Sequence, residues 1–280
     1  MTVKEALSQA ETALAVAGIA DARFDALCLA EHALGKSKTW LRLRLGDRLG
    51  DDARDALFAL VERRTTGEPL QYILGSWDFY GLPFAVGDGV LIPRPETEML
   101  VEEAAAFCAA NSNAVVYDLC AGTGCVGLSV AKRFPQAQVL LFEYSAQAMG
   151  YLQKNLESLA VRNAKIIFCD VLHPCDLDLP KPDCILSNPP YIACAEIAAL
   201  QKEVQFEPPM ALDGGADGLL FYRAIAANWF CLLRPNGVFA LECGEGQAAQ
   251  IVKIFHAYGA DCGIKADFNG IERVVFGKFN

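Results

Sequence analysis

An apolar run from Asp183 to Ser187 ends in four residues that could hold an amino group, Asn188, Pro189, Pro190 and Tyr191. Proline has no N–H, so two in succession end a strand and leave carbonyl groups there without neighbouring donors. Asn188 adds a side-chain carbonyl and Tyr191 an aromatic face. Two acceptors can take both hydrogens of a planar NH2 group while the ring packs against its plane. We therefore predict these four residues as catalytic, although Pro-Pro also serves as an ordinary strand stop.

A glycine-rich turn lies earlier in the chain. Residues 115–127 have the pattern of a strand, a glycine turn and a helix start. Gly122, Gly124 and Gly127 match the dinucleotide-binding fingerprint, and Glu143 ends the next expected strand, where an acid that binds ribose belongs. Glycine in such a turn lets backbone N–H groups approach a ligand closely. The motif indicates a cofactor that contains a nucleoside.

Acidic residues around this turn favour one nucleoside cofactor. Asp118 ends the strand before the turn, where its charge would repel a pyrophosphate but could pair with an ammonium group. S-adenosylmethionine carries an amino acid there and no phosphate. Glu143 would then bind the ribose hydroxyls, and Asp170 could accept the adenine amino group, although each acid could instead cap a loop. We predict S-adenosylmethionine as the cofactor, with contacts from Asp118, Cys120, Ala121, Gly122, Thr123, Gly124, Glu143, Asp170, Val171 and Asn188.

The composition limits the partners. The chain has 280 residues, 53% hydrophobic and 21% charged, so it is long enough for one large or two modest globular domains. Its net charge of −10 argues against binding along nucleic-acid phosphates, which depends on clustered Lys and Arg. We therefore expect no direct contact with nucleic acid. Apolar residues nowhere run uninterrupted for the ~18 positions of a membrane-spanning helix, so no membrane contact is expected.

Cysteine usage indicates a reducing compartment. Eleven cysteines is an odd number for a set of disulfides, and the start, Met1–Ala6, has no signal-peptide pattern. We expect free thiols, a cytoplasmic location and a monomer. No Cys-x-x-Cys pair occurs, so no metal site is predicted.

The elements that must position these residues follow from periodicity. From Val3 to Arg64 apolar residues recur at three- and four-residue spacing, which predicts a small helical bundle. Glu68–Asp88 is rich in Gly, Pro and aromatic residues and predicts a β-hairpin linker. After Asn113 strand and helix patterns alternate, which is typical of a parallel sheet covered on both faces. The expected domains are residues 1–66, 67–90 and 91–280.

In an open sheet of this kind, ligands bind beyond the carboxyl ends of the strands, which is where both motifs lie. The expected strands are Ala114–Asp118, Gln138–Phe142, Lys165–Cys169, Asp183–Ser187 and Gly237–Leu241, followed by a terminal hairpin of Gly263–Asp267 and Glu272–Phe276. The expected helices are Val126–Phe134, Ala146–Leu159, Gly218–Leu233 and Gln247–Tyr258.

Two further segments border the predicted site. In Ile92–Glu98 two prolines keep the chain extended and place Arg94 on a stiff lip, while Thr97 can cap the helix that follows. Ile192–Asp217 is too long for a plain connection, and we expect it to wall the pocket beside Tyr191.

These motifs together resemble the HemK/PrmC family, the protein-(glutamine-N5) methyltransferases that act on peptide chain release factors. The resemblance extends over almost the whole chain. The chain departs from the usual pattern at Cys120-Ala121, where the family commonly has Gly and then Thr or Ser, and at Glu143, where Asp is usual. The matching segments are Pro69–Gly75, Phe79–Gly81, Ile92–Glu98, Asp118-Leu119-x-x-Gly122-Thr123-Gly124, Asn188–Tyr191 and Asn269-Gly270-x-Glu272-Arg273-Val274.

The resemblance implies an α/β fold: a class I, Rossmann-like methyltransferase domain with seven strands, preceded by a helical domain that docks the substrate and by a hairpin linker. It also implies that S-adenosylmethionine is the methyl donor. The acceptor would be the glutamine of a Gly-Gly-Gln tripeptide in a release factor, so that the reaction modulates translation termination.

Rival functions use parts of the same pattern. A DNA adenine-N6 methyltransferase needs a similar rim, because adenine N6 is also a planar NH2 group, but it needs a basic cleft that this acidic chain does not favour. A methyltransferase for a ribosomal-protein glutamine is a closer rival, although Pro69–Gly75 and Phe79–Gly81 favour the release-factor branch. A dinucleotide oxidoreductase explains the glycine turn but not Asn-Pro-Pro-Tyr. A non-catalytic binding module predicts damage to the rim, which is intact.

Overall fold

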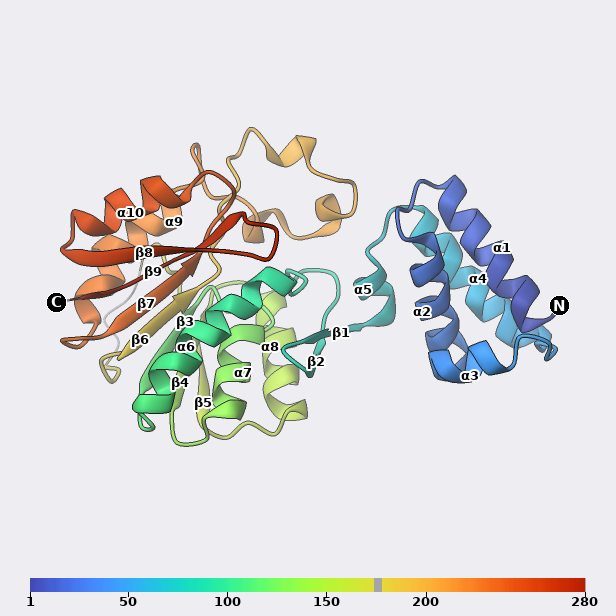
Figure 1. Cartoon of the computed structure of the whole chain (residues 1–280), viewed down its shortest axis with the longest axis horizontal. Coiled ribbons are helices and arrows are strands. Elements are labelled where there is room, and N and C mark those ends of the chain that lie inside the picture. Colours follow the sequence, from blue (N-terminus) through green and yellow to red (C-terminus); the bar gives the residue numbers. More distant parts are fainter. Residues whose placement is uncertain (174–177, 280) are drawn as a thin grey trace. The chain divides into compact units, whose positions relative to one another are not determined.

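A computed structural model describes residues 1–173 and 178–279, which form two compact units (Figure 1). The first unit comprises Met1–Ser76 together with Gln201–Phe206, and the second comprises Trp77–Leu200 and Glu207–Asn280. The short segment Gln201–Phe206 therefore belongs to the helical unit, although it lies within the long loop after Tyr191. The predicted three-part division at residues 66 and 90 stays a prediction.

The first unit is a helical bundle, as the spacing of apolar residues predicts. A capping box at Thr2 and Glu5 begins the first helix, and the Ser37 hydroxyl accepts the Trp40 N–H at the start of the third. Buried faces recur every three or four residues, as on Ala6, Ala10 and Leu14. The helices are α1 (Val3–Val16), α2 (Ala22–Leu34), α3 (Lys38–Leu43), α4 (Asp51–Thr65) and α5 (Leu70–Leu74).

A buried ion cluster links three parts of this unit. The Arg64 guanidinium donates to Asp25 on α2 at 2.7 Å and to Glu203 in the returning segment at 2.5 Å. Burial raises the pKa of Asp25, and the Arg64 charge counteracts this. Because both Arg64 and Asp25 are buried, loss of Arg64 would leave the Asp25 carboxylate without its counter-ion, whereas loss of Asp25 would leave Arg64 paired with Glu203 alone.

A two-stranded hairpin follows the bundle within the predicted linker Glu68–Asp88, whose first part is not a strand but forms α5. Its strands are β1 (Ser76–Phe79) and β2 (Leu82–Ala85). The two turn residues, Tyr80 and Gly81, both have positive φ angles, 50° and 73°. Two positive φ angles in a two-residue turn match the twist of the flanking strands, which is the type I′ arrangement.

The second unit is built around a seven-stranded sheet in the order β5-β4-β3-β6-β7-β9-β8. The first five strands in this order pair in parallel, and β9 pairs antiparallel with β7 and β8. Chain order reverses at β3, and ligands bind in the crevice at such a switch point. The strands are β3 (Val115–Leu119), β4 (Gln138–Glu143), β5 (Ala164–Phe168), β6 (Cys184–Ser187), β7 (Val238–Glu242), β8 (Ala260–Ala266) and β9 (Glu272–Phe279).

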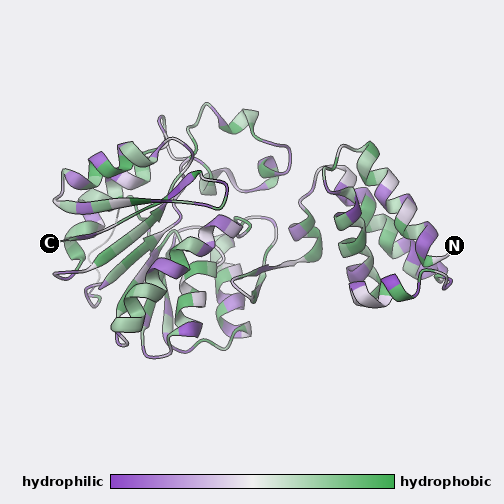
Figure 2. Ribbon diagram, in the orientation of Figure 1, coloured by the Kyte–Doolittle hydropathy of each residue, from purple (hydrophilic) through white to green (hydrophobic). Residues whose placement is uncertain are grey.

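Helices cover both faces of this sheet, so the unit has three layers (Figures 1 and 2). One face packs against α6 (Glu98–Ala110), α7 (Cys125–Arg133) and α8 (Ala146–Ser158), and the other against α9 (Leu220–Ala224) and α10 (Ala248–His256). The strands are the hydrophobic centre of the unit in Figure 2, as expected for strands buried on both faces. These layers confirm the predicted α/β fold.

The predicted helix Gly218–Leu233 is not one regular α-helix. After α9 the backbone widens into a π-helix over Ile225–Trp229 and tightens into a 3-10 turn over Phe230–Leu232. Trp229 is buried there and packs edge-on against Tyr117 and Phe142. Its indole N–H donates to the Val171 carbonyl at 2.9 Å. Within the described residues, no helix is both long and apolar enough to cross a membrane.

Candidate functional site

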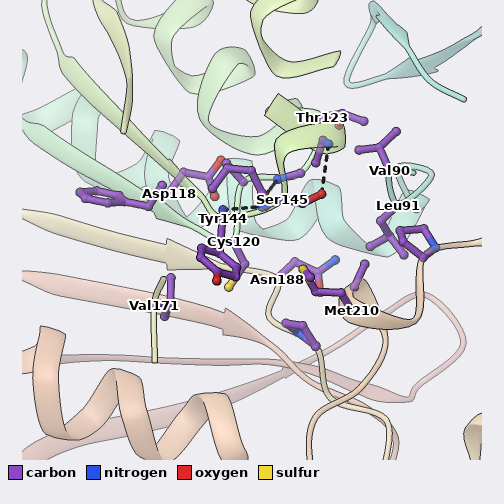
Figure 3. Close-up of a pocket in the computed structure, with 18 of the residues that line it drawn as sticks. Val90, Leu91, Asp118, Cys120, Thr123, Tyr144, Ser145, Val171, Asn188 and Met210 are labelled. Atoms are coloured by element: carbon purple, nitrogen blue, oxygen red, sulfur yellow. Dashed lines mark hydrogen bonds between the residues drawn. The ribbon is translucent and has the colours of Figure 1, made fainter. Parts of the chain in front are cut away.

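A cavity of about 230 Å3 opens at the carboxyl ends of β3, β4, β5 and β6 (Figure 3). Its lining comes from the turns after these strands, where the sequence predicts the site. Each strand contributes a short segment: Cys120–Thr123 after β3, Tyr144 and Ser145 after β4, Cys169–Leu172 after β5, and Asn188 and Pro190 after β6.

The glycine turn after β3 requires unusual backbone angles. Cys120, Gly122 and Gly124 have φ angles of 60°, 57° and 79°. A side chain at Gly124 would collide with Leu152 and Leu128. Cys120 holds its positive φ without the freedom of glycine, at a cost on the order of 1 kcal/mol. This position is one of the two where the chain departs from the usual family pattern.

Asp118 lies beneath this turn and is buried. Its carboxylate Oδ2 accepts the N–H of Gly127, in the first turn of α7, at 2.8 Å. A side chain on Gly127 would meet the Leu141 side chain at 2.3 Å and this oxygen at 2.9 Å, so the third glycine of the motif is needed for packing against both residues. Burial raises the pKa of Asp118 to about 7, and the Gly127 hydrogen bond opposes the shift.

Glu143 ties the glycine turn to the start of α8. Its Oε2 accepts the Gly122 N–H at 2.7 Å, and its Oε1 accepts the N–H groups of Tyr144 and Ser145 at 2.8 and 2.7 Å. Each carboxylate oxygen has two acceptor sites, so Oε2 keeps one for a ligand hydroxyl. The carboxylate is therefore fixed in place and can still accept a hydrogen bond from a ligand.

The wall after β5 contains Asp170 and Val171. Asp170 Oδ1 accepts the Leu172 N–H at 2.9 Å, and its Oδ2 lies 3.0 Å from Nδ1 of His173. Nearby, the half-exposed ring of Tyr144 stacks on Phe168 with centroids 5.5 Å apart. Tyr144 lines the cavity and was missed by sequence reasoning, since an aromatic residue after a strand is not distinctive.

The rim after β6 is only partly in the cavity. Asn188 and Pro190 line it, whereas Pro189 and Tyr191 are not among the lining residues. The Tyr191 hydroxyl is 3.5 Å from Oε1 of Glu242, and burial raises the pKa of Tyr191 well above its usual value. Of the predicted catalytic residues, the structure therefore brings Asn188 and Pro190 to the cavity.

Two residues that sequence reasoning did not place in the site are hydrogen-bonded in series to Asn188: Thr97, which also lines the cavity, and Glu242, which does not. The amide Nδ2 of Asn188 donates to Oγ1 of Thr97 at 3.2 Å, and that hydroxyl donates to Oε2 of Glu242 at 2.6 Å. Thr97 precedes α6, but its hydroxyl makes no capping bond, so the predicted cap is wrong. Glu242 ends β7, and burial raises its pKa to about 7.

A buried carboxylate holds the lip of the cavity. Glu207 accepts the Ile92 N–H at 3.0 Å and is also paired with the Arg94 guanidinium. The residues that follow it, Pro208, Met210 and Ala211, line the cavity, so part of the loop after Tyr191 walls the pocket as predicted. Arg94 lies on the lip as expected, fastened to this loop.

Comparisons with known proteins identify the family. Residues 5–75 match the PrmC N-terminal domain and residues 96–206 match the methyltransferase small domain. A release factor glutamine methyltransferase of Geobacter sulfurreducens is 40% identical, over 99% of this chain and 96% of that protein. This chain belongs to the release factor glutamine methyltransferase family. A member from Thermodesulfovibrio yellowstonii is 39% identical over 78% of both chains.

Solved structures support the fold of the second unit. A methyltransferase from Pyrococcus furiosus superposes with a TM-score of 0.52 at 14% identity, covering 71% of this chain and 90% of that one. The hMettl16 catalytic domain gives a TM-score of 0.55 at 15% identity, covering 70% and 76%. The sheet is that of class I methyltransferases, as the family resemblance implies.

Most of the predicted cofactor residues of this family member meet around the one cavity. Gly124 is the exception and is instead the N-cap residue of α7. Asp118, Glu143 and Asp170 are all among the lining residues. Within residues 1–173 and 178–279, no cluster of three or more His, Cys, Asp or Glu side chains could hold a metal ion.

Proposed function

We propose that this protein transfers a methyl group from S-adenosylmethionine to the side-chain amide nitrogen of the glutamine in the Gly-Gly-Gln motif of a peptide chain release factor. The observation that carries this proposal is that Asn188 lines the same cavity as the glycine turn and Glu143. An acceptor for an amide and a nucleoside-binding turn thus share one space. The names of the relatives support a release-factor glutamine as the acceptor.

The donor set fits S-adenosylmethionine, which supplies an electrophilic methyl group on a sulfonium. Asp118 would hold the ammonium of the methionine part, Glu143 the ribose hydroxyls, and Asp170 with Val171 the adenine. The free acceptor site on Glu143 Oε2 supports the ribose assignment. Cys120, Ala121, Gly122 and Thr123 would surround the amino acid part, with Gly124 supporting the turn.

The protein contributes placement. A carboxamide nitrogen is a poor nucleophile, because its lone pair is delocalised into the carbonyl. Asn188 Oδ1 and the Pro189 carbonyl would each accept one N–H and aim the nitrogen at the methyl carbon, with Pro190 shaping the rim and Tyr191 packing beside the amide. Alignment of this kind contributes roughly 7–11 kcal/mol at best. The acceptors also stabilise positive charge that develops on the nitrogen.

We also propose the partner and the setting of this reaction. The acceptor is a release factor whose Gly-Gly-Gln loop enters the cavity, and the helical unit docks the rest of that factor. The protein acts as a monomer in the cytoplasm, where release factors work, and makes no direct contact with nucleic acid.

The test is methyl transfer from labelled S-adenosylmethionine to a purified release factor. A factor with Gln→Ala in its Gly-Gly-Gln loop, a ribosomal-protein fraction and adenine-containing DNA serve as parallel acceptors. Label on the wild-type factor alone supports the proposal, and label on DNA or on a ribosomal protein instead refutes it. Asn188→Ala should cut turnover at least 100-fold while cofactor affinity changes little. Loss of cofactor binding alone would contradict the role of Asn188.

A further inference from the structure

The side-chain amide of Asn188 can hold a substrate N–H only if its oxygen faces the cavity. Its two ends have nearly the same shape, but the carbonyl accepts hydrogen bonds and the NH2 group donates them. The opposite orientation would present two donors to a substrate NH2 group. The activity proposed above therefore requires something in the protein to select one orientation.

The hydroxyl of Thr97 can make this selection. It has one proton, which it donates to Oε2 of Glu242 at 2.6 Å. With that proton committed, its oxygen can only accept, and it accepts from Nδ2 of Asn188 at 3.2 Å. The Asn188 oxygen is then left for the cavity that this residue lines.

Glu242 determines the direction of the chain of hydrogen bonds. An ionised carboxylate only accepts, so it forces the Thr97 proton toward itself. Thr97 and Glu242 are both only 2% exposed, so water does not compete freely for these groups. The backbone of Glu242 is held as well, because its carbonyl accepts the Tyr222 hydroxyl at 2.7 Å.

We propose that Thr97 and Glu242 are positioning residues that hold the Asn188 amide with its oxygen toward the acceptor substrate. This inference rests on the proposed function and deepens it. Thr97 lines the cavity, but in this account its hydroxyl is committed to Glu242 and Asn188 and does not bind the substrate. Both residues act through Asn188. We call the chain of hydrogen bonds from Asn188 through Thr97 to Glu242 the relay, and the ionised state of Glu242 gives it its direction.

Protonation of Glu242 would reverse the relay. A carboxylic acid can donate to Thr97. The Thr97 proton would then turn toward Asn188 and favour the amide orientation in which the Asn188 oxygen faces Thr97 and its NH2 group faces the cavity. The pKa of Glu242 is raised to about 7 by burial, so this reversal falls within an accessible range of pH. The titratable groups whose charges act on or from Glu242 are Arg94, Glu96, Cys125, Tyr191, Tyr222, Cys243 and Arg273.

The first measurement does not depend on turnover. The side-chain NH2 resonance of Asn188 in 15N-labelled protein is assigned by its loss in Asn188→Ala. Thr97→Val keeps the shape of the side chain but removes the hydroxyl, so it should shift this resonance and speed its exchange with solvent, whereas Thr97→Ser should leave both close to wild type. An unchanged resonance in Thr97→Val would overturn the proposal.

Kinetics then tests the consequence. Thr97→Val should lower kcat about 10- to 100-fold with S-adenosylhomocysteine affinity within about twofold of wild type, and Thr97→Ser should restore most of the turnover. Wild-type kcat should rise with pH through an apparent pKa near 7, and Glu242→Gln should abolish that rise. Equal losses in Thr97→Ser and Thr97→Val, or an unaltered pH profile in Glu242→Gln, would overturn the proposal. Failure of the wild type to methylate the release factor would instead refute the proposed function, and the resonance measurement would still decide on the relay.

Discussion

Asp118 offers a sharp test, because the structure gives it a role that differs from the one the sequence predicts. The sequence predicts that its carboxylate pairs with the cofactor ammonium, whereas the structure places Oδ2 on the Gly127 N–H beneath the glycine turn. Both roles are possible for one carboxylate, since its two oxygens have about four acceptor sites. Two substitutions separate them.

Asp118→Ala removes both roles, and Asp118→Asn removes only the charge. Without an acceptor, the buried Gly127 N–H loses its partner, which costs about 1–3 kcal/mol in the free energy of unfolding. The amide oxygen introduced by Asp118→Asn can still accept that N–H, so this variant should keep most of the stability. If the carboxylate also holds an ammonium, both variants lose a charge-assisted hydrogen bond of about 1.5–3 kcal/mol. Affinity for S-adenosylhomocysteine should then fall roughly 10- to 100-fold.

The raised pKa of Asp118 determines how stability and cofactor binding should change with pH. The pKa of Asp118 is raised from 3.8 to about 7 in the folded protein, so the contribution of this group to stability is fully present below pH 3.8 and is lost as the pH rises through about 7. Asp118→Asn should lack this loss, and its stability relative to wild type should increase over that range. Pairing with an ammonium lowers the pKa again, so cofactor binding at pH 7 should release about half a proton from Asp118.

Isothermal titration calorimetry in buffers of different ionisation enthalpy measures both affinity and proton release. The wild type should release more protons than Asp118→Asn, and both variants should bind more weakly. Equal affinity and equal proton release in wild type and Asp118→Asn would refute the ammonium contact. Asp118 would then serve only to hold α7 and the glycine turn together.

Three further outcomes follow from buried polar groups. Glu207→Ala removes the carboxylate that holds Ile92 and Arg94 and should lower the free energy of unfolding by about 2–3 kcal/mol. Glu196→Ala, at an exposed carboxylate on the same loop, should change it by less than about 0.5 kcal/mol, and equal effects in denaturant titrations would contradict the role of Glu207. Arg64→Met should destabilise the helical unit by about 3–5 kcal/mol, because it leaves a buried carboxylate unpaired, and unchanged thermal unfolding of the full chain would argue against this. Burial raises the pKa of the Cys125 thiol to about 12, so peptide mass spectrometry should find it alkylated by iodoacetamide at pH 8 far more slowly than the exposed Cys231, and the reverse order would show that the turn opens readily.

The sheet could be predicted from the sequence because its strands are buried on both faces and form continuous apolar runs. The observed strands β3 and β6 lie within one residue of the predicted Ala114–Asp118 and Asp183–Ser187. Parallel strands bring their carboxyl ends to one edge, so Asn188 and Glu143 could be placed near the glycine turn without knowledge of tertiary contacts. The irregular helix after Gly218 could not be predicted, because apolar spacing alone does not reveal the π-helical widening.

The hydrogen bonds that connect Asn188 through Thr97 to Glu242 could not be predicted in the same way. Thr97 and Glu242 are 145 residues apart, and Thr97 has the sequence context of a helix cap. A threonine hydroxyl has one proton, and only the fold determines whether it bonds to the nearby backbone or to a distant carboxylate. The hydrogen-bond partner of Asp118 could not be predicted either, because the sequence places Asp118 beside the turn but does not show which backbone N–H its carboxylate accepts.

The charges around the cavity distinguish the two cofactor classes that the glycine motif allows. Asp118, Glu143 and Asp170 are among the residues that line it. Among the described lining residues the one Lys or Arg is Arg94, which is already paired with Glu207. A pyrophosphate would meet these acids without a free cation to offset them, whereas a cofactor with a sulfonium and an ammonium would be attracted. The same acids favour positive charge that develops on an amide nitrogen during methylation, so one electrostatic arrangement suits both the donor and the acceptor.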